Sequence, residues 1–433
     1  MIKFIDGMGK DIKWIKSNIN RPTAMEVEEQ KNAVVDILNN VQQFGDDAIL
    51  EYTYKFDGVK FDGSNYFEVS ENEIKAAFKK VDKSFTDVLK KSRDNILKFH
   101  IMQKQNSWMS FKNGITLGQK IEPLEKVGVY VPGGRAAYPS SVLMNVIPAK
   151  VAGVDEIIMV TPPQRDGSIN SNTLVAASIS GVDRIFRIGG AQAIGALAFG
   201  TNTIPQVDKI VGPGNIYVAL AKKEVYGYVD IDMIAGPSEI LIVADDTANP
   251  EFIAADLMSQ AEHDPMACAI LITTSKQLGE AVMDNLNKQI INLSLKDTIK
   301  ASLANYGAII TVDSINKAID ITNLIAPEHL ELAVKNPFDW LGYIKNAGAI
   351  FLGQYTPEPL GDYMAGPNHV LPTGGTAKFF SPLGVENFIK KSSVISYTDK
   401  ALCNIYKEVA CFARAEGLTA HANSMQVRFE KNE

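Results

Sequence analysis

The chain has 433 residues, a formal net charge of −7 and an apolar fraction of 46%. The negative charge argues against a nucleic-acid-binding role, and the lack of an apolar run of 18 or more residues argues against a membrane span. Cys268, Cys403 and Cys411 have no CxxC spacing, which fits a reducing compartment rather than a disulfide framework or a thiolate zinc site.

The N-terminal region shows helical periodicity. Its first residues, MIKFIDGMGKDIKW, lack the apolar stretch and the cleavage site of a signal peptide, so we expect a cytoplasmic protein. Apolar residues then recur at intervals of three and four along residues 26–56 and again along residues 70–100. Ser70 and Glu73 have the spacing of a capping box. We expect a helical region over 1–125, packed partly on the second of two α/β domains.

From Lys126 the pattern changes to short Val- and Ile-rich runs. Buried strands are predicted where such runs begin, at Lys126, Glu156, Arg184 and Lys209. Helices are predicted between and after them, around residues 141–151, 171–180, 191–199 and 215–225. Apolar strands separated by helices are typical of a parallel sheet covered on both faces. We therefore expect a first α/β domain over 126–238.

A second series of the same kind follows. Its strand candidates begin at Ile240, Ala267, Gly307, His329 and Gly348, with helices around 250–262 and 276–292. The two α/β domains could come from duplication, although no repeat is visible in the letters. We expect the second domain over 239–381 and a C-terminal helical segment over 382–433.

Three glycine-dense turns in the first domain each follow a predicted strand and enter a predicted helix. They are GVYVPGGRAAYPS from Gly128, RIGGAQAIGALAFGT from Arg187, and KIVGPGNIYVA from Lys209. Such turns bind nucleotide phosphates, because glycine lets the backbone approach and the helix N-terminus attracts anions. None is a GxGxxG fingerprint, and any single turn is equally explained by tight packing. Together they favour a nucleotide site, with Tyr130, Gln192 and Asn215 as its candidate contacts.

Four of the five histidines lie in dense polar motifs in the second half of the chain. These are SQAEHDP with His263, APEHLEL with His329, GDYMAGPNHVLPTGG with His369, and EGLTAHANS with His421. Histidine is the usual transition-metal ligand and the usual general base near neutral pH. The motifs are therefore the strongest indication of chemistry in the sequence.

Each of the first two motifs also has a plain structural interpretation. Gln260 and His263 are three residues apart and share one helix face, yet such a pair is more often a polar helix end. Glu328 and His329 could divide two proton transfers, or could be one exposed acid beside one packed histidine.

The last two motifs are also ambiguous. Asp362 and His369 lie in a long loop, which is usually either functional or disordered. Glu416 and His421 follow a terminal helix, where chain ends often fray. Taken as one set, Gln260, His263, Asp362 and His421 offer nitrogen and oxygen donors that suit zinc with room for substrate.

The motifs together resemble the histidinol dehydrogenase family. GVYVPGG, GGAQAIGALAFGT, GPGN, GPSE, SQAEHDP, PEHLEL, GPNHVLPT and EGLTAHA occur in the family's order and span nearly the whole chain. The departures are small: in SPLGVENF, Pro382 and Gly384 replace the more usual Gly and Ser. The resemblance implies two incomplete Rossmann-like parallel-sheet domains with small helical N- and C-terminal parts.

The resemblance also implies the reaction and the site. The family oxidises L-histidinol to L-histidine through L-histidinal, reduces two NAD, and ends histidine biosynthesis. It implies Glu328 and His329 as catalytic residues, Gln260, His263, Asp362 and His421 as zinc ligands, and Tyr130, Gln192 and Asn215 as NAD contacts. It implies substrate contacts from Ser238, Gln260, His263, His329, Asp362, His369, Glu416 and His421. It further implies an intertwined homodimer in which the C-terminal segment completes the partner's site.

Three other functions are compatible with parts of this pattern. A related zinc- and NAD-dependent dehydrogenase could act on another small alcohol. A zinc hydrolase could use the same ligands, but it gives the glycine turns no role. A solute-binding protein would leave the catalytic motifs unexplained. Cys268 could form a thiohemiacetal with an aldehyde, but its apolar run ACAILIT indicates a buried, inert thiol.

Overall fold

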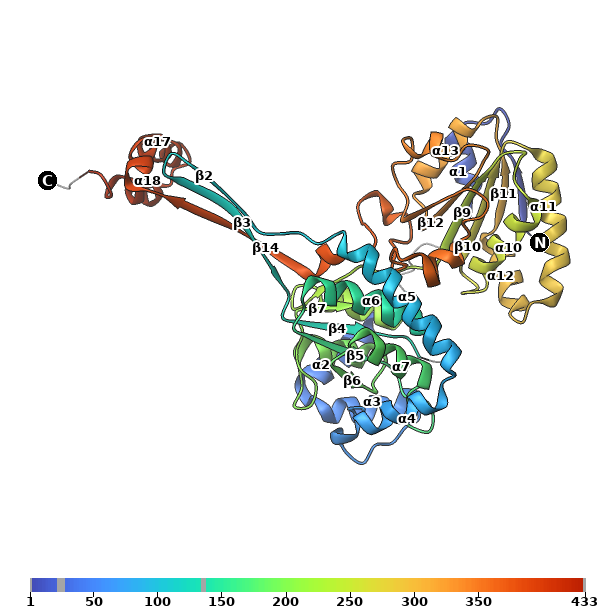
Figure 1. Cartoon of the computed structure of the whole chain (residues 1–433), viewed down its shortest axis with the longest axis horizontal. Helices are drawn as coiled ribbons and strands as arrows, with labels where there is room; N and C mark the ends of the chain where they lie inside the picture. Colours follow the sequence, from blue (N-terminus) through green and yellow to red (C-terminus); the bar gives the residue numbers. More distant parts are fainter. Residues whose placement is uncertain (1, 22–27, 134–137, 431–433) are drawn as a thin grey trace. The chain divides into compact units, whose positions relative to one another are not determined.

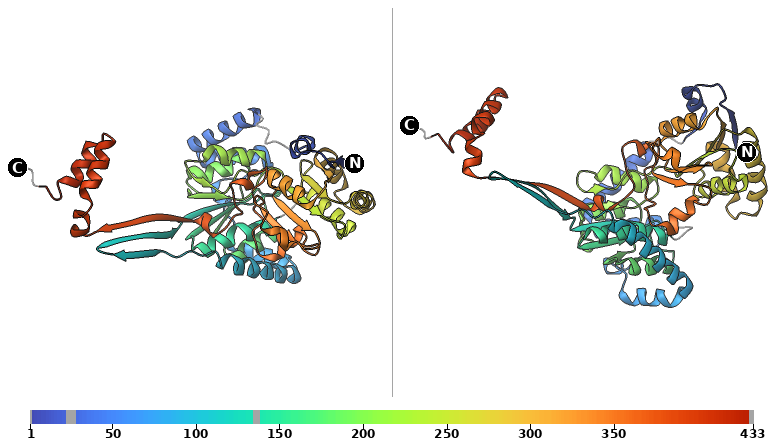
Figure 2. Two further views of the ribbon diagram at one scale, coloured as in Figure 1. Left: turned by 90° about the horizontal axis from the view of Figure 1, so that it is seen from above. Right: turned by 45° about the horizontal axis from the view of Figure 1, so that its top comes forward.

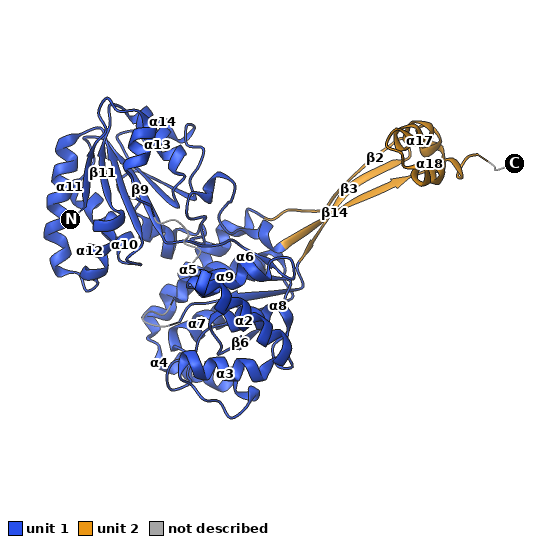
Figure 3. Cartoon of the chain, turned by 180° about the vertical axis from the view of Figure 1, so that it is seen from behind, with its two compact units in different colours: residues 1–103, 124–388 blue, residues 104–123, 389–433 orange. Residues whose placement is uncertain are grey.

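The computed structural model describes residues 2–21, 28–133 and 138–430. The chain separates into two compact units, coloured differently in Figure 3. Unit 1 comprises Met1–Gln103 and Leu124–Phe388, and unit 2 comprises Lys104–Pro123 and Ile389–Glu433. Residues 26–27 of the first predicted helix and residues 134–137 of the first glycine turn lie outside the described residues.

The first sheet of unit 1 is parallel throughout and has the strand order β6-β5-β4-β7-β8 (Figure 1). Its strands are β4 (Lys126–Tyr130), β5 (Glu156–Val160), β6 (Arg184–Phe186), β7 (Lys209–Val211) and β8 (Asp230–Ile231). The connecting helices are α6 (Pro139–Ala152), α7 (Ser171–Ser180), α8 (Gly190–Phe199) and α9 (Ile216–Val225). The first four strands and all four helices were predicted, and β8 is an addition.

Alternate side chains of this sheet face two separate cores, which explains its continuous apolar strands. On β5, Ile158 and Val160 pack in one core, whereas Ile157 and Met159 pack in the other. N-terminal helices complete both layers, because α2 and α3 contribute to the first core and α4 and α5 to the second. Their bounds are α2 (Glu28–Phe44), α3 (Asp46–Asp57), η1 (Ser64–Tyr66), α4 (Glu71–Lys80) and α5 (Lys83–Ile101).

The second sheet is also parallel, with the order β1-β11-β10-β9-β12-β13. Its strands are β1 (Lys3–Asp6), β9 (Glu239–Ala244), β10 (Cys268–Thr273), β11 (Ala308–Thr311), β12 (His329–Ala333) and β13 (Ala349–Leu352). All five predicted strands are present. β1 is an addition, because the N-terminal region was expected to be helical. It joins this sheet together with α1 (Ile12–Asn18), which packs in the core beside α13.

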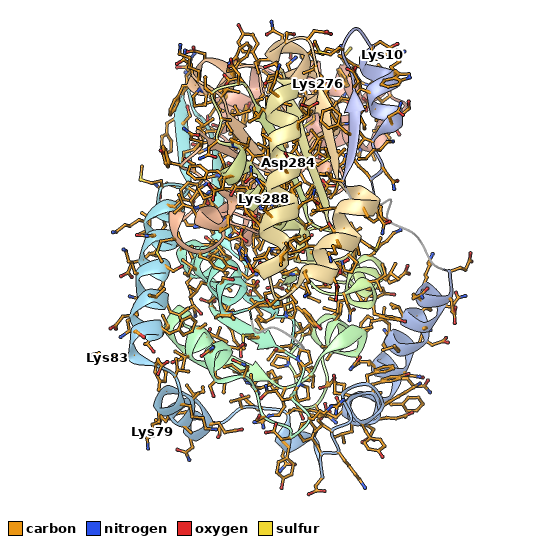
Figure 4. All side chains as sticks on the ribbon, turned by 90° about the vertical axis from the view of Figure 1, so that its right-hand side faces the viewer. Lys10, Lys79, Lys83, Lys276, Asp284 and Lys288 are labelled. Carbon is orange, nitrogen blue, oxygen red and sulfur yellow. The ribbon has the colours of Figure 1, made fainter. Side chains whose placement is uncertain are left out.

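Helices again cover both faces of the second sheet. They are α10 (Pro250–Ala261), α11 (Lys276–Gln289), η2 (Ile290–Asn292), α12 (Lys296–Tyr306), α13 (Ile315–Ile325) and α14 (Phe338–Leu341). On α11, Leu278, Val282 and Leu286 are buried, whereas the labelled Asp284 and Lys288 extend from the opposite face (Figure 4). The rest of unit 1 forms the short turns α15 (Glu358–Leu360), η3 (Gly361–Ala365), η4 (Thr376–Lys378) and η5 (Val385–Phe388).

Unit 2 is an antiparallel sheet with the strand order β14-β3-β2, followed by three helices (Figure 2). Its elements are β2 (Trp108–Lys112), β3 (Ile115–Pro123), β14 (Ile389–Tyr397), α16 (Asp399–Cys403), α17 (Tyr406–Ala415) and α18 (Thr419–Gln426). The expectation of helical regions over 1–125 and 382–433 did not include these strands. Their sequences mix polar and apolar residues without the long Val- and Ile-rich runs of a buried strand. Among the described residues, no helix has the length and hydropathy that crossing a bilayer requires.

Candidate active site

Glu328 and His329 meet at the amino-terminal end of β12, where both contact the neighbouring strand β9. The Glu239 N–H donates a 2.8 Å hydrogen bond to Glu328 Oε2, and His329 Nδ1 lies 3.0 Å from the Glu239 carbonyl oxygen. A carbonyl oxygen can only accept, so Nδ1 carries the imidazole proton. The remaining nitrogen, Nε2, is buried without a hydrogen-bond partner among the described residues. The geometry leaves this nitrogen free to act as a base.

Burial changes the acidity of both side chains. Glu328 is 6% exposed and His329 is 4% exposed. Loss of solvation raises the pKa of Glu328 well above its usual value and lowers the pKa of His329, because burial disfavours the charged form of either group. A neutral imidazole next to a carboxyl of raised pKa is suited to proton transfer near neutral pH.

Asp362 and His369 come to the same place from the predicted loop. Asp362 Oδ1 lies 3.9 Å from His329 Nε2 and 3.8 Å from His369 Nδ1. The three residues line a cavity of about 400 Å³. Burial lowers the pKa of His369. The cavity is large enough for a small polar substrate, and its walls combine imidazole, carboxylate and apolar surface.

The predicted loop is held in place by α5 and α6. Asp362 lies in a π-helical turn, η3, whose Tyr363 and Met364 carbonyls accept hydrogen bonds from Ser92 and Asn95 of α5. After the turn, Asn368 donates a 2.7 Å hydrogen bond to the Met144 carbonyl of α6.

His100, the histidine without a polar motif, supports the same loop from α5. It is fully buried, its Nε2 lies 3.5 Å from Asn368 Nδ2, and its Nδ1 lies 2.8 Å from the Ile96 carbonyl. Its role is structural, since it helps to fix Asn368, the residue that precedes His369.

Side chains that could hold a metal ion gather beside Glu328 and His329. His263, Asp362 and Glu358 each offer a donor atom, and these atoms all lie within 4.8 Å of one another. Gln260 of α10, three residues before His263, is fully buried, and neither atom of its amide has a hydrogen-bond partner among the described residues. An amide oxygen without a partner, three residues from an imidazole, is suited to bind a cation. The donor set fits zinc, which accepts nitrogen and oxygen ligands.

Gln260, His263 and Asp362 of the predicted zinc set thus belong to unit 1. The fourth ligand, His421, belongs to unit 2, as does the predicted substrate contact Glu416. Both side chains are exposed within that unit. Their assignment to the site stays a prediction. Ser238 is half-buried and immediately precedes Glu239, the residue that contacts both Glu328 and His329.

Sequence reasoning missed Glu358 and Glu239. Glu358 precedes Asp362 by four residues in PEPLGDY, a spacing that places two carboxylates on one helical turn. This spacing could have identified Glu358 from the sequence. Glu239 acts through its backbone N–H and carbonyl, for which side-chain identity gives no signal.

The three glycine turns of the first sheet converge on Tyr130, the last residue of β4. The Tyr130 hydroxyl accepts a 3.2 Å hydrogen bond from the Gly190 N–H at the start of α8, and burial raises its pKa to about 12. Gln192, in the first turn of α8, has both amide atoms buried without a partner among the described residues. Asn215 caps α9 and is exposed. These positions are compatible with the predicted NAD contacts, and the assignment stays a prediction.

Cys268 lies outside this chemistry. It is 1% exposed on the central strand β10, with Sγ 3.3 Å from the Tyr306 carbonyl oxygen. Burial raises the pKa of its thiol to about 12. A thiol that stays protonated at neutral pH is a poor nucleophile, so the structure supports the packing interpretation of this residue.

Two parallel sheets covered by helices, with a buried acid, a buried imidazole and side chains that could hold a metal ion beside the second sheet, are typical of an α/β enzyme. Residues 20–429 match the family model for histidinol dehydrogenase. The chain therefore belongs to the histidinol dehydrogenase family and is an oxidoreductase that acts on an alcohol or aldehyde.

Individual relatives agree with this assignment. The chain is 60% identical over 395 residues to histidinol dehydrogenase of Clostridium acetobutylicum, covering 91% of each chain. It is 56% identical over 429 residues to that of Caldanaerobacter subterraneus subsp. tengcongensis, covering 99% of each. The crystal structure of histidinol dehydrogenase from Elizabethkingia anophelis is 39% identical, with a TM-score of 0.94, covering 99% of this chain and 98% of that one.

Proposed function

We propose that this chain oxidises L-histidinol to L-histidine through L-histidinal, the last step of histidine biosynthesis, with NAD as oxidant and a bound zinc ion. The observation that carries the proposal is the orientation of His329. Its Nδ1 is held by the Glu239 carbonyl, and its free Nε2 lies beside Asp362 in the cavity. The family assignment supplies the substrate class.

The residues of the proposed zinc site are Gln260, His263, Asp362 and His421. Zinc would hold the substrate's imidazole and amine in place, and NAD would supply the hydride acceptor. The role of these four side chains is therefore positioning, which removes an entropic part of the barrier. Ser238, His369 and Glu416 complete the proposed substrate contacts, and the Glu416 carboxylate suits the cationic substrate.

His329 and Glu328 would divide the proton transfers. In the first oxidation, His329 Nε2 takes the hydroxyl proton while the carbinol carbon loses a hydride, which leaves the aldehyde. Glu328 then takes a proton from water as the water oxygen attacks the aldehyde carbon. The His329 imidazolium returns its proton to the former carbonyl oxygen, which gives the hydrate and leaves His329 neutral again. His329 takes a hydroxyl proton of the hydrate as the second hydride leaves, and the carboxylic acid results. General bases of this kind contribute about 10²–10⁴-fold each.

The test is to measure the two half-reactions separately. His329→Asn should lower histidinol oxidation by about 10²-fold or more, whereas Glu328→Gln should lower histidinal oxidation by a similar factor and spare the alcohol step. Zinc content and thermal unfolding of both variants serve as folding controls. Near-normal alcohol oxidation by His329→Asn, or intact aldehyde oxidation by Glu328→Gln, would contradict the assignment. Wild-type protein should yield two NADH per histidinol, which distinguishes it from a dehydrogenase of another small alcohol.

We also propose a homodimer in which unit 2 completes the partner's site. Every residue of β2 is exposed in the single chain. Large apolar side chains are exposed on the sheet and helices of unit 2, including Phe111 at 74%, Ile395 at 70% and Phe412 at 71%. Soluble monomers rarely expose such surface, and a second copy would cover it.

Mixing two inactive variants tests this exchange. His329→Asn damages unit 1, and His421→Asn damages unit 2. If the units pair across the dimer, refolding the two variants together should restore about a quarter of wild-type activity, because half of the dimers then contain one intact site. Pairing within one chain would give no recovery, and that result would overturn the exchange.

The proposed location is the cytoplasm. Cys268, Cys403 and Cys411 are all free thiols, which suits a reducing compartment. Cell fractionation followed by immunodetection tests this: recovery of the protein in the soluble cytoplasmic fraction is the expected result.

A further inference from the structure

Glu386 is an exposed carboxylate that takes no part in the proposed proton transfers or in the group that could hold a metal ion. It comes from η5 and lines the same cavity of about 400 Å³ as His329, Asp362 and His369. We propose that Glu386 distinguishes substrate from product by charge: it favours the cationic alcohol and disfavours the carboxylate that the reaction forms. This inference rests on the proposed function, which supplies both molecules.

The composition of the cavity leaves Glu386 as its uncompensated charge. Among the described residues that line the cavity, Asp362 and Glu386 are the acids, and none is a lysine or arginine. Asp362 belongs to the group that could hold a metal ion, whereas Glu386 does not. Glu386 forms no ion pair with any described residue. An exposed glutamate is ionised at neutral pH, so its charge acts on the molecule that occupies the cavity.

A neighbouring glycine leaves room for this carboxylate. A Cβ at Gly384 would lie 2.6 Å from Glu386 Oε2 and 3.0 Å from Gln103 Oε1, so a larger residue would displace the Glu386 carboxylate. Gln103 also lines the cavity, and its Oε1 accepts a 3.1 Å hydrogen bond from the Val385 N–H. The end of α5 and the turn η5 are therefore joined at the point where Glu386 reaches the cavity.

The reaction changes the charge of the molecule in the cavity. L-Histidinol has an ammonium group and no anionic group, whereas oxidation to L-histidine adds a carboxylate at the reacting carbon. Glu386 attracts the cationic substrate as it enters and repels the new carboxylate. A divalent ion held beside Asp362 would attract that carboxylate and retain the product. Glu386 opposes this retention, which favours release of the product.

Calorimetric titration without NAD measures the binding of both molecules separately from turnover. Zinc-loaded full-length wild type and Glu386→Gln are each titrated with L-histidinol and with L-histidine at low ionic strength. The quantity compared is the Kd of histidine divided by the Kd of histidinol. Glu386→Gln should lower this ratio by about three- to tenfold, the effect of one charge across a small hydrated cavity, and about 0.5 M salt should diminish the change. A ratio within about twofold of wild type, or an equal change in both Kd values, overturns the proposal.

Two further variants separate the charge of Glu386 from its shape. Glu386→Asp keeps the charge and should keep the ratio within about twofold of wild type. Glu125→Gln removes an exposed carboxylate that does not line the cavity, and it should leave the ratio unchanged. A fall in the ratio of either variant as large as that of Glu386→Gln would show that the charge of Glu386 in the cavity is not the cause, and the proposal fails.

NADH formation from L-histidinol by the same wild-type preparation is assayed in parallel. Two NADH per histidinol together with an unchanged ratio in Glu386→Gln refute only this inference. The expected fall in the ratio without any NADH formation refutes only the proposed function.

Discussion

His329 is oriented by the backbone of Glu239, whose carbonyl oxygen lies 3.0 Å from His329 Nδ1. The Glu239 N–H donates a hydrogen bond to Glu328, so one residue of β9 fixes both members of the proposed catalytic pair. The Glu239 side chain is in turn held by Arg21, whose Nη2 lies 2.6 Å from both carboxylate oxygens. Arg21 also donates to the Ile325 carbonyl. Arg21, which comes from the N-terminal region of the chain, therefore helps to position the proposed acid and base.

The first prediction concerns Arg21→Met. Methionine keeps the apolar length of the side chain but leaves the buried Glu239 carboxylate unpaired. Breaking a buried pair costs about 3–5 kcal/mol, and because Arg21 is 23% exposed we expect a smaller loss of unfolding free energy, about 2–3 kcal/mol. We also expect kcat of both half-reactions to fall by about tenfold, since Glu239 positions both catalytic residues. Urea denaturation and steady-state kinetics measure the two effects.

Arg93→Met provides the control for this variant. Arg93 pairs with Asp94 on the surface, where the two side chains are 35% and 49% exposed, so its loss should cost less than about 1 kcal/mol. If Arg21→Met changes stability but leaves kcat at the wild-type value, Arg21 is a structural residue and has no positioning role.

The sequence predicted most of unit 1 because the strands there are short, apolar and separated by clear helices. Runs such as EIIMV and AIIT are buried on both sheet faces, so these strands could be predicted from their own residues. The strands of unit 2 could not, because β2 and β14 are largely exposed and lack that apolar pattern. In addition, β14 pairs with β3 across more than 250 residues of sequence.

The site was predicted only in part, for a different reason. Motifs identified side chains that the structure brings to one cavity, such as His329 and Asp362, because residue identity carries that signal. The contacts that hold these side chains in place leave no such signal in the sequence. Arg21 and Glu239 are 218 positions apart, and Glu239 holds the catalytic pair through backbone atoms. The π-helical turn that aims Asp362 also depends on Ser92, a residue of a distant helix.

The second prediction concerns Cys268→Ala. Because burial raises the pKa of this thiol to about 12, it is not a thiolate at neutral pH, and the aldehyde step should not need it. We expect the variant to yield two NADH per histidinol with a kcat within about twofold of wild type, and to lose about 1–2 kcal/mol of stability through the cavity left behind. Loss of the aldehyde step alone would show that Cys268 forms a covalent intermediate.

Mass mapping after iodoacetamide treatment checks the same point in the wild type. Cys403 and Cys411 are exposed, whereas Cys268 is buried. The two exposed thiols should be alkylated first, and activity should outlast their modification if both remain distant from the chemistry.

The third prediction is a pH dependence that arises from Asp57, the last residue of α3. Burial raises its pKa from 3.8 to about 6, and its Oδ2 has no hydrogen-bond partner among the described residues. The folded state therefore binds this proton more tightly than the unfolded state. The contribution of this proton to the stability of the folded state is complete below about pH 4 and is lost as the pH rises through about 6.

Asp57→Asn should remove the loss of stability that Asp57 causes as the pH rises. We expect equal stability of variant and wild type near pH 4, and a variant more stable at pH 7 by at most about 1 kcal/mol, because solvent screens a partly exposed group. Chemical denaturation at several pH values measures the difference. Asp62→Asn is the control, since Asp62 is exposed and should show no such trend. A variant that is less stable than wild type at pH 7 would mean that the Asp57 charge is compensated.

The last prediction concerns the buried pair of Lys222 and Asp232, which clamps the GPGN turn. Lys222 Nζ donates to Asp232 Oδ1 and, at 2.9 Å, to the Gly212 carbonyl, while Asp232 Oδ2 accepts the Gly212 N–H at 2.8 Å. The two side chains are 3% and 1% exposed. Gly212 has φ +110°, and a Cβ there would collide with the Tyr130 carbonyl. The clamp therefore fixes the turn against Tyr130, one of the proposed NAD contacts.

Lys222→Met should release this turn and leave a buried carboxylate unpaired, at a cost of about 3–5 kcal/mol. If the turn binds NAD, the KM for NAD should rise by about tenfold or more while the KM for histidinol stays within about twofold. Lys150→Met is the matched control, because its partner Asp183 is a partly exposed aspartate of the same domain; it should cost less than about 1 kcal/mol. A Lys222→Met protein that remains folded with an unchanged KM for NAD would remove the GPGN turn from the cofactor site, because the clamp would then serve only the packing of α9 on the first sheet.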